Sequence, residues 1–134
     1  MTRMTATIAA IAATLALSAA PVAEACTRAL YVGPENRVLT GRSMDWKLPM
    51  VSNLWVFPRG MERDGAAGER SVTWTARYGS LALSGYDIAT ADGMNEAGLN
   101  VNLQWEVNAT YPDDDGVTPT ISLSVFPQYL LDRY

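Results

Sequence analysis

The pattern of apolar and polar residues changes after residue 25. Before that point, Ile8 to Leu17 is an apolar run interrupted by a single Thr. The run fits the hydrophobic region of a secretory signal and is too short to span a hydrocarbon core of about 30 Å. Beyond residue 25, short segments of alternating apolar and polar residues take its place.

These alternating segments predict a β-rich domain with a helix near its C-terminal end. In 98–104, apolar residues alternate with Asn and Gln, as in a half-buried strand. Apolar residues in 120–134 recur at helical spacing, so we expect a helix there. The segment 59–70 mixes charged residues with glycines and is expected to be an exposed loop. The other strands are expected near 27–32, 37–44, 54–57, 71–77, 81–85 and 88–91.

The residues around position 25 predict where a signal would be cleaved. Pro21 ends any helix, and Ala23-Glu24-Ala25 offers small residues at the two positions that signal peptidase recognises. We therefore expect residues 1–25 to be a signal peptide, whose removal leaves Cys26 with a free α-amine in a periplasmic or secreted protein. The alternative is a lipoprotein signal, with Cys26 acylated on a membrane-anchored binding module, but Glu24 is unusual in such signals.

The composition restricts the chemistry available to this cysteine. The chain has one Cys and no His, which excludes Cys-His and Ser-His-Asp catalytic groups. An unpaired thiol in an oxidising compartment is either a structural residue or a functional one. An N-terminal cysteine carries its own base, because an α-amine with a pKa of about 7.7–8.0 can accept the thiol proton and return it to a leaving amine. We therefore interpret Cys26 as an N-terminal nucleophile for amide hydrolysis.

The charge distribution excludes one class of partner. The net charge is −4, which leaves no basic footprint for nucleic acid. The acidic run Asp113-Asp114-Asp115-Gly116 follows Pro112 and is expected to be a solvated loop, with a cation site as the alternative. We expect no cofactor, no metal in the active site and no stable membrane anchor.

Two charged residues are candidates to orient the N-terminal cysteine. The segment 37–46 alternates like a strand and places Arg42 and Asp45 close to its end. Residues three apart on a strand face opposite sides, so both can reach one site only if the strand bends or ends near Asp45. Asp45 would then hydrogen-bond the amine and Arg42 would favour the thiolate. An ordinary surface ion pair is the alternative.

Three motifs in this order resemble the choloylglycine hydrolase family, which includes penicillin V acylases and bile salt hydrolases. They are Cys26-Thr27, Gly41-Arg42-Ser43-Met44-Asp45-Trp46 and Asp92-Gly93-Met94-Asn95-Glu96-Ala97-Gly98-Leu99. The resemblance implies an α+β fold, the four-layer αββα sandwich of N-terminal-nucleophile hydrolases. It also implies that Cys26 is nucleophile and base, that Arg42 and Asp45 are its catalytic partners, and that the backbone N–H of Trp105 helps form the oxyanion hole.

The substrate implied by the resemblance is a linear amide with an aromatic or acyl group. Trp105 and Trp46 are more similar to the Gram-negative penicillin V acylase branch, and we expect them either to form an apolar wall for the substrate or to pack in the core. Trp55 and Trp74 lack a motif and are expected in the core. Bile salt hydrolase and acyl-homoserine lactone acylase activities are the alternatives, and the full-length form is expected to be a homotetramer.

The resemblance covers about the first third of the family pattern. Residues 26–134 are therefore expected to be the N-terminal part of an incomplete domain, inactive by itself. A downstream Asn and a downstream Arg of the family site have no counterpart in the sequence. A predicted β-rich segment without helices to cover its sheets agrees with this interpretation.

Overall fold

The computed structural model describes residues 26–106 and 108–134. The predicted signal peptide therefore lies outside the described residues. Strands and one α-helix make up the regular structure of the described residues, together with two short 3₁₀ turns, η1 (Pro34–Asn36) and η2 (Gly68–Arg70). This mixture agrees with the predicted α+β class.

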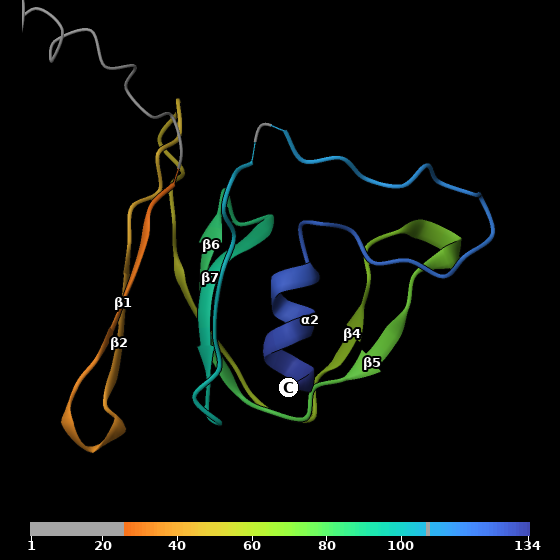
Figure 1. Cartoon of the computed structure of the whole chain (residues 1–134). Coiled ribbons are helices and arrows are strands. Elements are labelled where there is room, and N and C mark those ends of the chain that lie inside the picture. The colour runs from red at the N-terminus through yellow and green to blue at the C-terminus, as the bar shows by residue number, and fades with distance from the viewer. Residues whose placement is uncertain (1–25, 107) are drawn as a thin grey trace, which may run out of the picture.

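The central element is a four-stranded antiparallel sheet, called here the main sheet. Its strand order is β3-β6-β7-β8. In Figure 1, α2 lies on one side of the main sheet and the β1–β2 hairpin lies on the other. The four strands are β3 (Leu54–Phe57), β6 (Ser80–Gly85), β7 (Ala89–Asn95) and β8 (Asn100–Asn102).

The strand β7 is longer than the prediction near 88–91, because it continues through Gly93 to Asn95. Glycine weakens a strand unless another group needs the space of its side chain. Here a Cβ on Gly93 would lie 2.4 Å from Leu131 Cδ1 and 3.0 Å from the Leu81 carbonyl oxygen. Glycine thus allows α2 to pack directly on the backbone of β7.

The loop prediction for 59–70 is wrong in part. Residues in this segment form β4 (Glu62–Asp64), which pairs antiparallel with β5 (Thr73–Thr75). A strand of charged residues carries no apolar alternation, so its pattern did not predict it. Its middle residue, Arg63, faces inward and forms an ion pair with Asp132, with 3.3 Å between Nε and Oδ2.

The C-terminal helix is shorter than predicted. The helix α2 (Phe126–Arg133) begins next to Pro127, which fits the first turn because proline lacks the backbone N–H that would be unpaired there. The residues before it are not helical: 123–125 form a turn, and Thr120 and Ser122 bond to distant backbone instead. The amide of Thr120 donates to Arg70 O, and the amide of Ser122 donates to Gly65 O.

The best buried part of the chain lies between α2, the main sheet and β5. Leu131 and Asp132 are fully buried, and the prediction that Trp74 belongs to the core is confirmed. The Asp132 carboxylate accepts hydrogen bonds from Trp74 Nε1 at 2.9 Å and from Gln128 Nε2 at 2.7 Å. A buried carboxylate needs such partners, so this network fixes how α2 packs.

Trp55 does not belong to the core, contrary to prediction. It is 46% exposed because β3 is an edge strand of the main sheet, and its Nε1 donates to Asp87. The acidic loop prediction holds: Asp113 to Gly116 is exposed and irregular. Asp114 pairs with Arg70, and Asp115 accepts from the Thr118 amide, so these two carboxylates have partners within the protein and not a metal ion.

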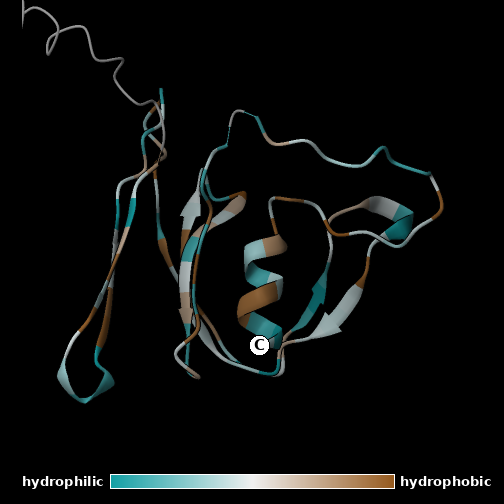
Figure 2. Cartoon of the chain, viewed as in Figure 1, coloured by the Kyte–Doolittle hydropathy of each residue, from teal (hydrophilic) through white to brown (hydrophobic). Residues whose placement is uncertain are grey.

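The apolar residues of the hairpin formed by β1 (Arg28–Val32) and β2 (Val38–Arg42) are exposed to solvent. All residues of β1 are exposed, and Figure 2 shows hydrophobic residues along both arms. None of the helices among residues 26–106 and 108–134 has the length and hydrophobicity of a membrane span.

Candidate active site

The candidate site forms where the β1–β2 hairpin meets the main sheet. Cys26 lies two residues before the start of β1 and is half-buried. The backbone N–H of Trp105 lowers the pKa of the Cys26 thiol by hydrogen-bonding to the thiolate. Burial raises this pKa, the backbone N–H of Asp45 and the charge of Arg42 lower it, and the Asp45 carboxylate raises it. The balance leaves the pKa below its ordinary value, which favours the nucleophilic form.

The strand predicted over 37–44 is shorter in the structure, since β2 ends at Arg42, and this end before Asp45 meets the condition for both residues to reach one site. Ser43 connects the next residues to the N-terminal end of β1. Its Oγ donates to Asp45 Oδ2 at 3.1 Å and accepts from the Thr27 amide at 3.2 Å, and its own amide donates to Thr27 O at 2.9 Å. These bonds hold Asp45 next to the residues that follow Cys26.

Arg42 is the most buried charged group of the site, with 7% of its side chain exposed. Its Nε donates to Asp92 Oδ1 at 2.8 Å, and its Nη2 donates to Leu103 O at 2.8 Å and Ala91 O at 3.3 Å. Its Nη1 donates to Ser43 O at 3.3 Å. The surface ion pair considered for Arg42 and Asp45 is therefore wrong, because Arg42 pairs with Asp92 inside the protein.

The two tryptophans of the predicted substrate wall contact each other. The ring centroids of Trp46 and Trp105 lie 5.6 Å apart in an edge-to-face arrangement. They are 48% and 56% exposed, so neither is a core residue. Trp46 Nε1 donates to the hydroxyl of Tyr86 at 3.1 Å, which fixes the orientation of its indole.

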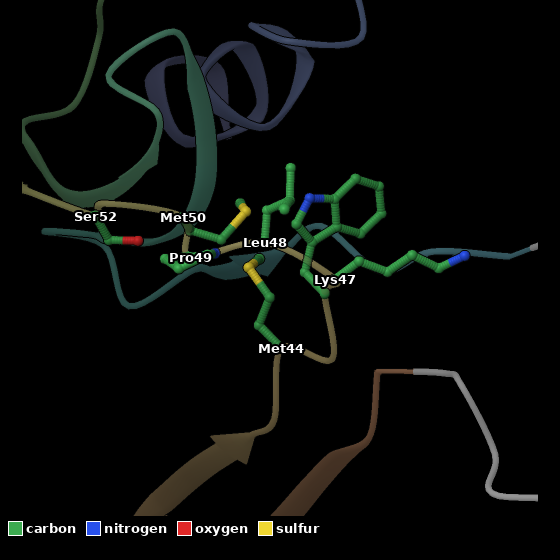
Figure 3. A pocket seen from close by; sticks show the side chains of 7 residues that line it. Met44, Lys47, Leu48, Pro49, Met50 and Ser52 are labelled. Carbon is green, nitrogen blue, oxygen red and sulfur yellow. The ribbon is translucent and has the colours of Figure 1, made fainter.

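An open groove adjoins Trp46. Its volume is about 530 Å³. Figure 3 shows the side chains of Met44, Leu48 and Met50 gathered in this groove, whereas Lys47 extends away from them. The wall of the groove is mostly apolar and flexible, which suits an acyl or aromatic group. Its lining residues are Met44, Trp46, Lys47, Leu48, Pro49, Met50 and Ser52.

Most of the motif at 92–99 stabilises the fold. Asn95 Nδ2 donates to Leu131 O, and its Oδ1 accepts from the amides of Ala97 and Leu99. Glu96 accepts from the Gly79 amide. Asp92 is the exception, because its carboxylate reaches Arg42.

Ser43 and Asp92 were not predicted as site residues from the sequence. The position of Ser43 between Arg42 and Asp45 was a signal that could have identified it. No local pattern identified Asp92, since its partner is distant in the chain. Among the described residues, no cluster of His, Cys, Asp and Glu has the arrangement of a metal site.

Comparisons with known proteins agree with the geometry. The model of the linear amide C–N hydrolases, choloylglycine hydrolase family, matches residues 26–134. Penicillin V acylase of Pectobacterium atrosepticum is 36% identical over 141 residues, which cover 98% of this chain and 38% of that protein. The structure of penicillin V acylase from Agrobacterium tumefaciens matches with a TM-score of 0.77 and 56% identity, covering 80% of this chain and 34% of the other. The chain therefore spans little more than a third of either relative.

Proposed function

The chain belongs to the choloylglycine hydrolase family of linear amide C–N hydrolases, and on this basis we propose that the protein hydrolyses a linear amide with Cys26 as N-terminal nucleophile. The family match and the solved relative confirm the predicted fold class. This chain covers about a third of the length of that relative. The proposal requires that residues 1–25 are removed, so that the α-amine of Cys26 is free. It also places the protein in the periplasm or outside the cell.

The observation that carries the proposal is the convergence of hydrogen-bond donors and positive charge on one thiol. The backbone N–H groups of Trp105 and Asp45 and the guanidinium of Arg42 all lower the pKa of Cys26. Arg42 ends β2 and Asp45 follows it, whereas Trp105 comes from a distant part of the chain after β8, and a thiol without a chemical role needs none of these groups.

The proposed reaction has two steps. The α-amine takes the thiol proton, the sulfur of Cys26 bonds to the amide carbon, and the resulting oxyanion accepts a hydrogen bond from the Trp105 N–H. The C–N bond then breaks, the α-ammonium returns its proton to the leaving amine, and an acyl thioester remains. Water, deprotonated by the same amine, attacks the thioester and releases the carboxylic acid and the thiol.

The substrate class follows from the surroundings of the thiol. Half-exposed indoles at Trp46 and Trp105 and the neighbouring apolar groove favour an acyl or aromatic side chain on the carbonyl. Penicillin V is the first substrate to test, because both relatives are penicillin V acylases. Bile-acid conjugates and acyl-homoserine lactones are further linear amides for the same assay.

The experiment is Cys26→Ser in a full-length protein that contains this segment. The α-amine is too weak a base to deprotonate a serine hydroxyl as readily as a thiol, so the serine is a much poorer nucleophile than Cys26. We therefore expect kcat to fall by orders of magnitude while the circular dichroism spectrum stays unchanged. Cys26→Ala should be equally inactive and serves as the control for residual serine chemistry. Near wild-type turnover by either variant would contradict the proposal.

A further inference from the structure

The hydrogen bonds of Arg42 leave it little freedom to move. Four acceptors surround its guanidinium, from Asp92, Leu103, Ala91 and Ser43. One N–H of Nη1 has no partner in the part of the chain that the structure describes. This arrangement, called here the Arg42 clamp, holds the guanidinium in one orientation, because its planar fork fits several fixed acceptors at once.

The clamp also connects the segments that carry the thiol's two backbone donors. The carbonyl of Leu103 lies shortly before Trp105 in the chain, and the carbonyl of Ser43 lies shortly before Asp45. Arg42 binds both carbonyls. A displaced guanidinium would therefore release the two N–H groups from Cys26 as well as remove its own charge.

The carboxylate of Asp92 is the only charged member of the clamp's acceptors. It is mostly buried, and its Oδ1 also accepts from Asn102 Nδ2 at 2.6 Å. Asn102 thereby fixes Asp92 from β8, while its own Oδ1 is buried without a partner among the described residues. A charge-assisted hydrogen bond to a carboxylate is roughly twice as strong as a neutral one. Asp92 therefore holds the Arg42 guanidinium more strongly than any one of the three carbonyl acceptors does.

We infer that Asp92, fixed by Asn102, is a positioning residue that acts on Cys26 through Arg42. This inference rests on the proposed function for its meaning in catalysis, but its physical content is the thiolate of Cys26. A purely structural role for Asp92 would change stability alone. The positioning role also changes the reactivity of a thiol that Asp92 does not contact.

The direction of the effect separates positioning from direct electrostatics. Arg42 and Asp45 are the side chains whose charges act on the thiol, together with its own α-amine in the processed protein. Removing a negative charge at Asp92 would by itself lower the pKa of Cys26. Releasing Arg42 and the two backbone donors would raise it. The two mechanisms therefore predict opposite shifts.

The test is the pH dependence of Cys26 alkylation by iodoacetamide in the full-length, processed protein. Asp92→Ala should move the midpoint up by about one pH unit, which makes alkylation about tenfold slower below the midpoint. Arg42→Met should produce a similar shift, and adding Asp92→Ala to Arg42→Met should cause no further rise of the midpoint. Asp87→Ala is the matched control, because it removes a carboxylate in the turn between β6 and β7 that accepts from Ser84 and Trp55 instead.

An unchanged or lowered midpoint in Asp92→Ala would overturn the inference, as would additive shifts in the double variant. If Asp92→Ala does not fold, Asn102→Ala provides the same test with a smaller expected shift, and Asn100→Ala on the same strand is its control. The assay needs no amide substrate. Loss of amide hydrolysis in every variant, or its absence in the wild type, would bear on the proposed function and leave this result intact.

Discussion

The two faces of β7 belong to regions of the molecule that are held together in different ways. Toward α2, Ala91, Gly93 and Asn95 are buried against a fully buried Leu131. Toward the β1–β2 hairpin, Asp92 makes an ion pair with Arg42, while most of the hairpin is exposed. Close packing stabilises the first region, and directed hydrogen bonds position the second.

This difference explains why the motif at 92–99 contains both residues that pack against α2 and a residue of the candidate site. Successive residues of a strand point to opposite faces, so Gly93 and Asn95 serve the packing of α2, while Asp92, directly before Gly93, serves the site. Along β7, residues that must be small or buried for α2 to pack thus alternate with a residue whose charge serves the site. Variants of alternate residues should therefore separate the two regions.

The largest expected effect breaks the packed region. In Asp132→Ala, the guanidinium of Arg63 loses its ion-pair partner and the Trp74 indole loses its hydrogen-bond acceptor. Removing one partner of a buried ion pair costs about 3–5 kcal/mol. Hydrogen exchange of the α2 amides in the full-length protein should become correspondingly faster. Asp113→Ala, at an exposed carboxylate, should leave it within error; equal exchange in the two variants would contradict the assigned network.

A smaller effect sharpens the comparison through one substitution made on both sides. Gly93→Ala should destabilise α2 by about 1–3 kcal/mol, because the added methyl overlaps Leu131. Gly41→Ala on β2 is the matched control, since its added methyl meets nothing within 4 Å. Exchange of the α2 amides should rise in the first variant alone. A similar rise in both would show that the two regions are not distinct.

The sequence predicted the elements whose stability depends on local pattern. The strand at 54–57 has the predicted bounds, because its apolar residues and flanking turns define it locally. The charged β4 was missed because its stability comes from pairing with β5. The start of α2 was misplaced because the contacts of Thr120 and Ser122 with distant backbone override the helical pattern.

The candidate site divides in the same way. Cys26, Arg42 and Asp45 were identified from motifs and Trp105 from the family resemblance, and the structure brings them together. The burial of Arg42 by Asp92, Ala91 and Leu103 depends on contacts between residues far apart in the chain. The spacing of apolar and polar residues along the sequence does not predict contacts of this kind. The exposure of Trp55 was missed for the same reason, because edge position is a property of the assembled sheet.

The most direct test of the central claim is the intact mass and N-terminal sequence of the protein purified from cells that produce it. We predict a mature chain that begins with unmodified Cys26, since only then is the α-amine free to act as base. An acylated, blocked or uncleaved N-terminus would remove that base. That result would contradict the N-terminal-nucleophile mechanism, and an acylated Cys26 would instead indicate a membrane-anchored protein.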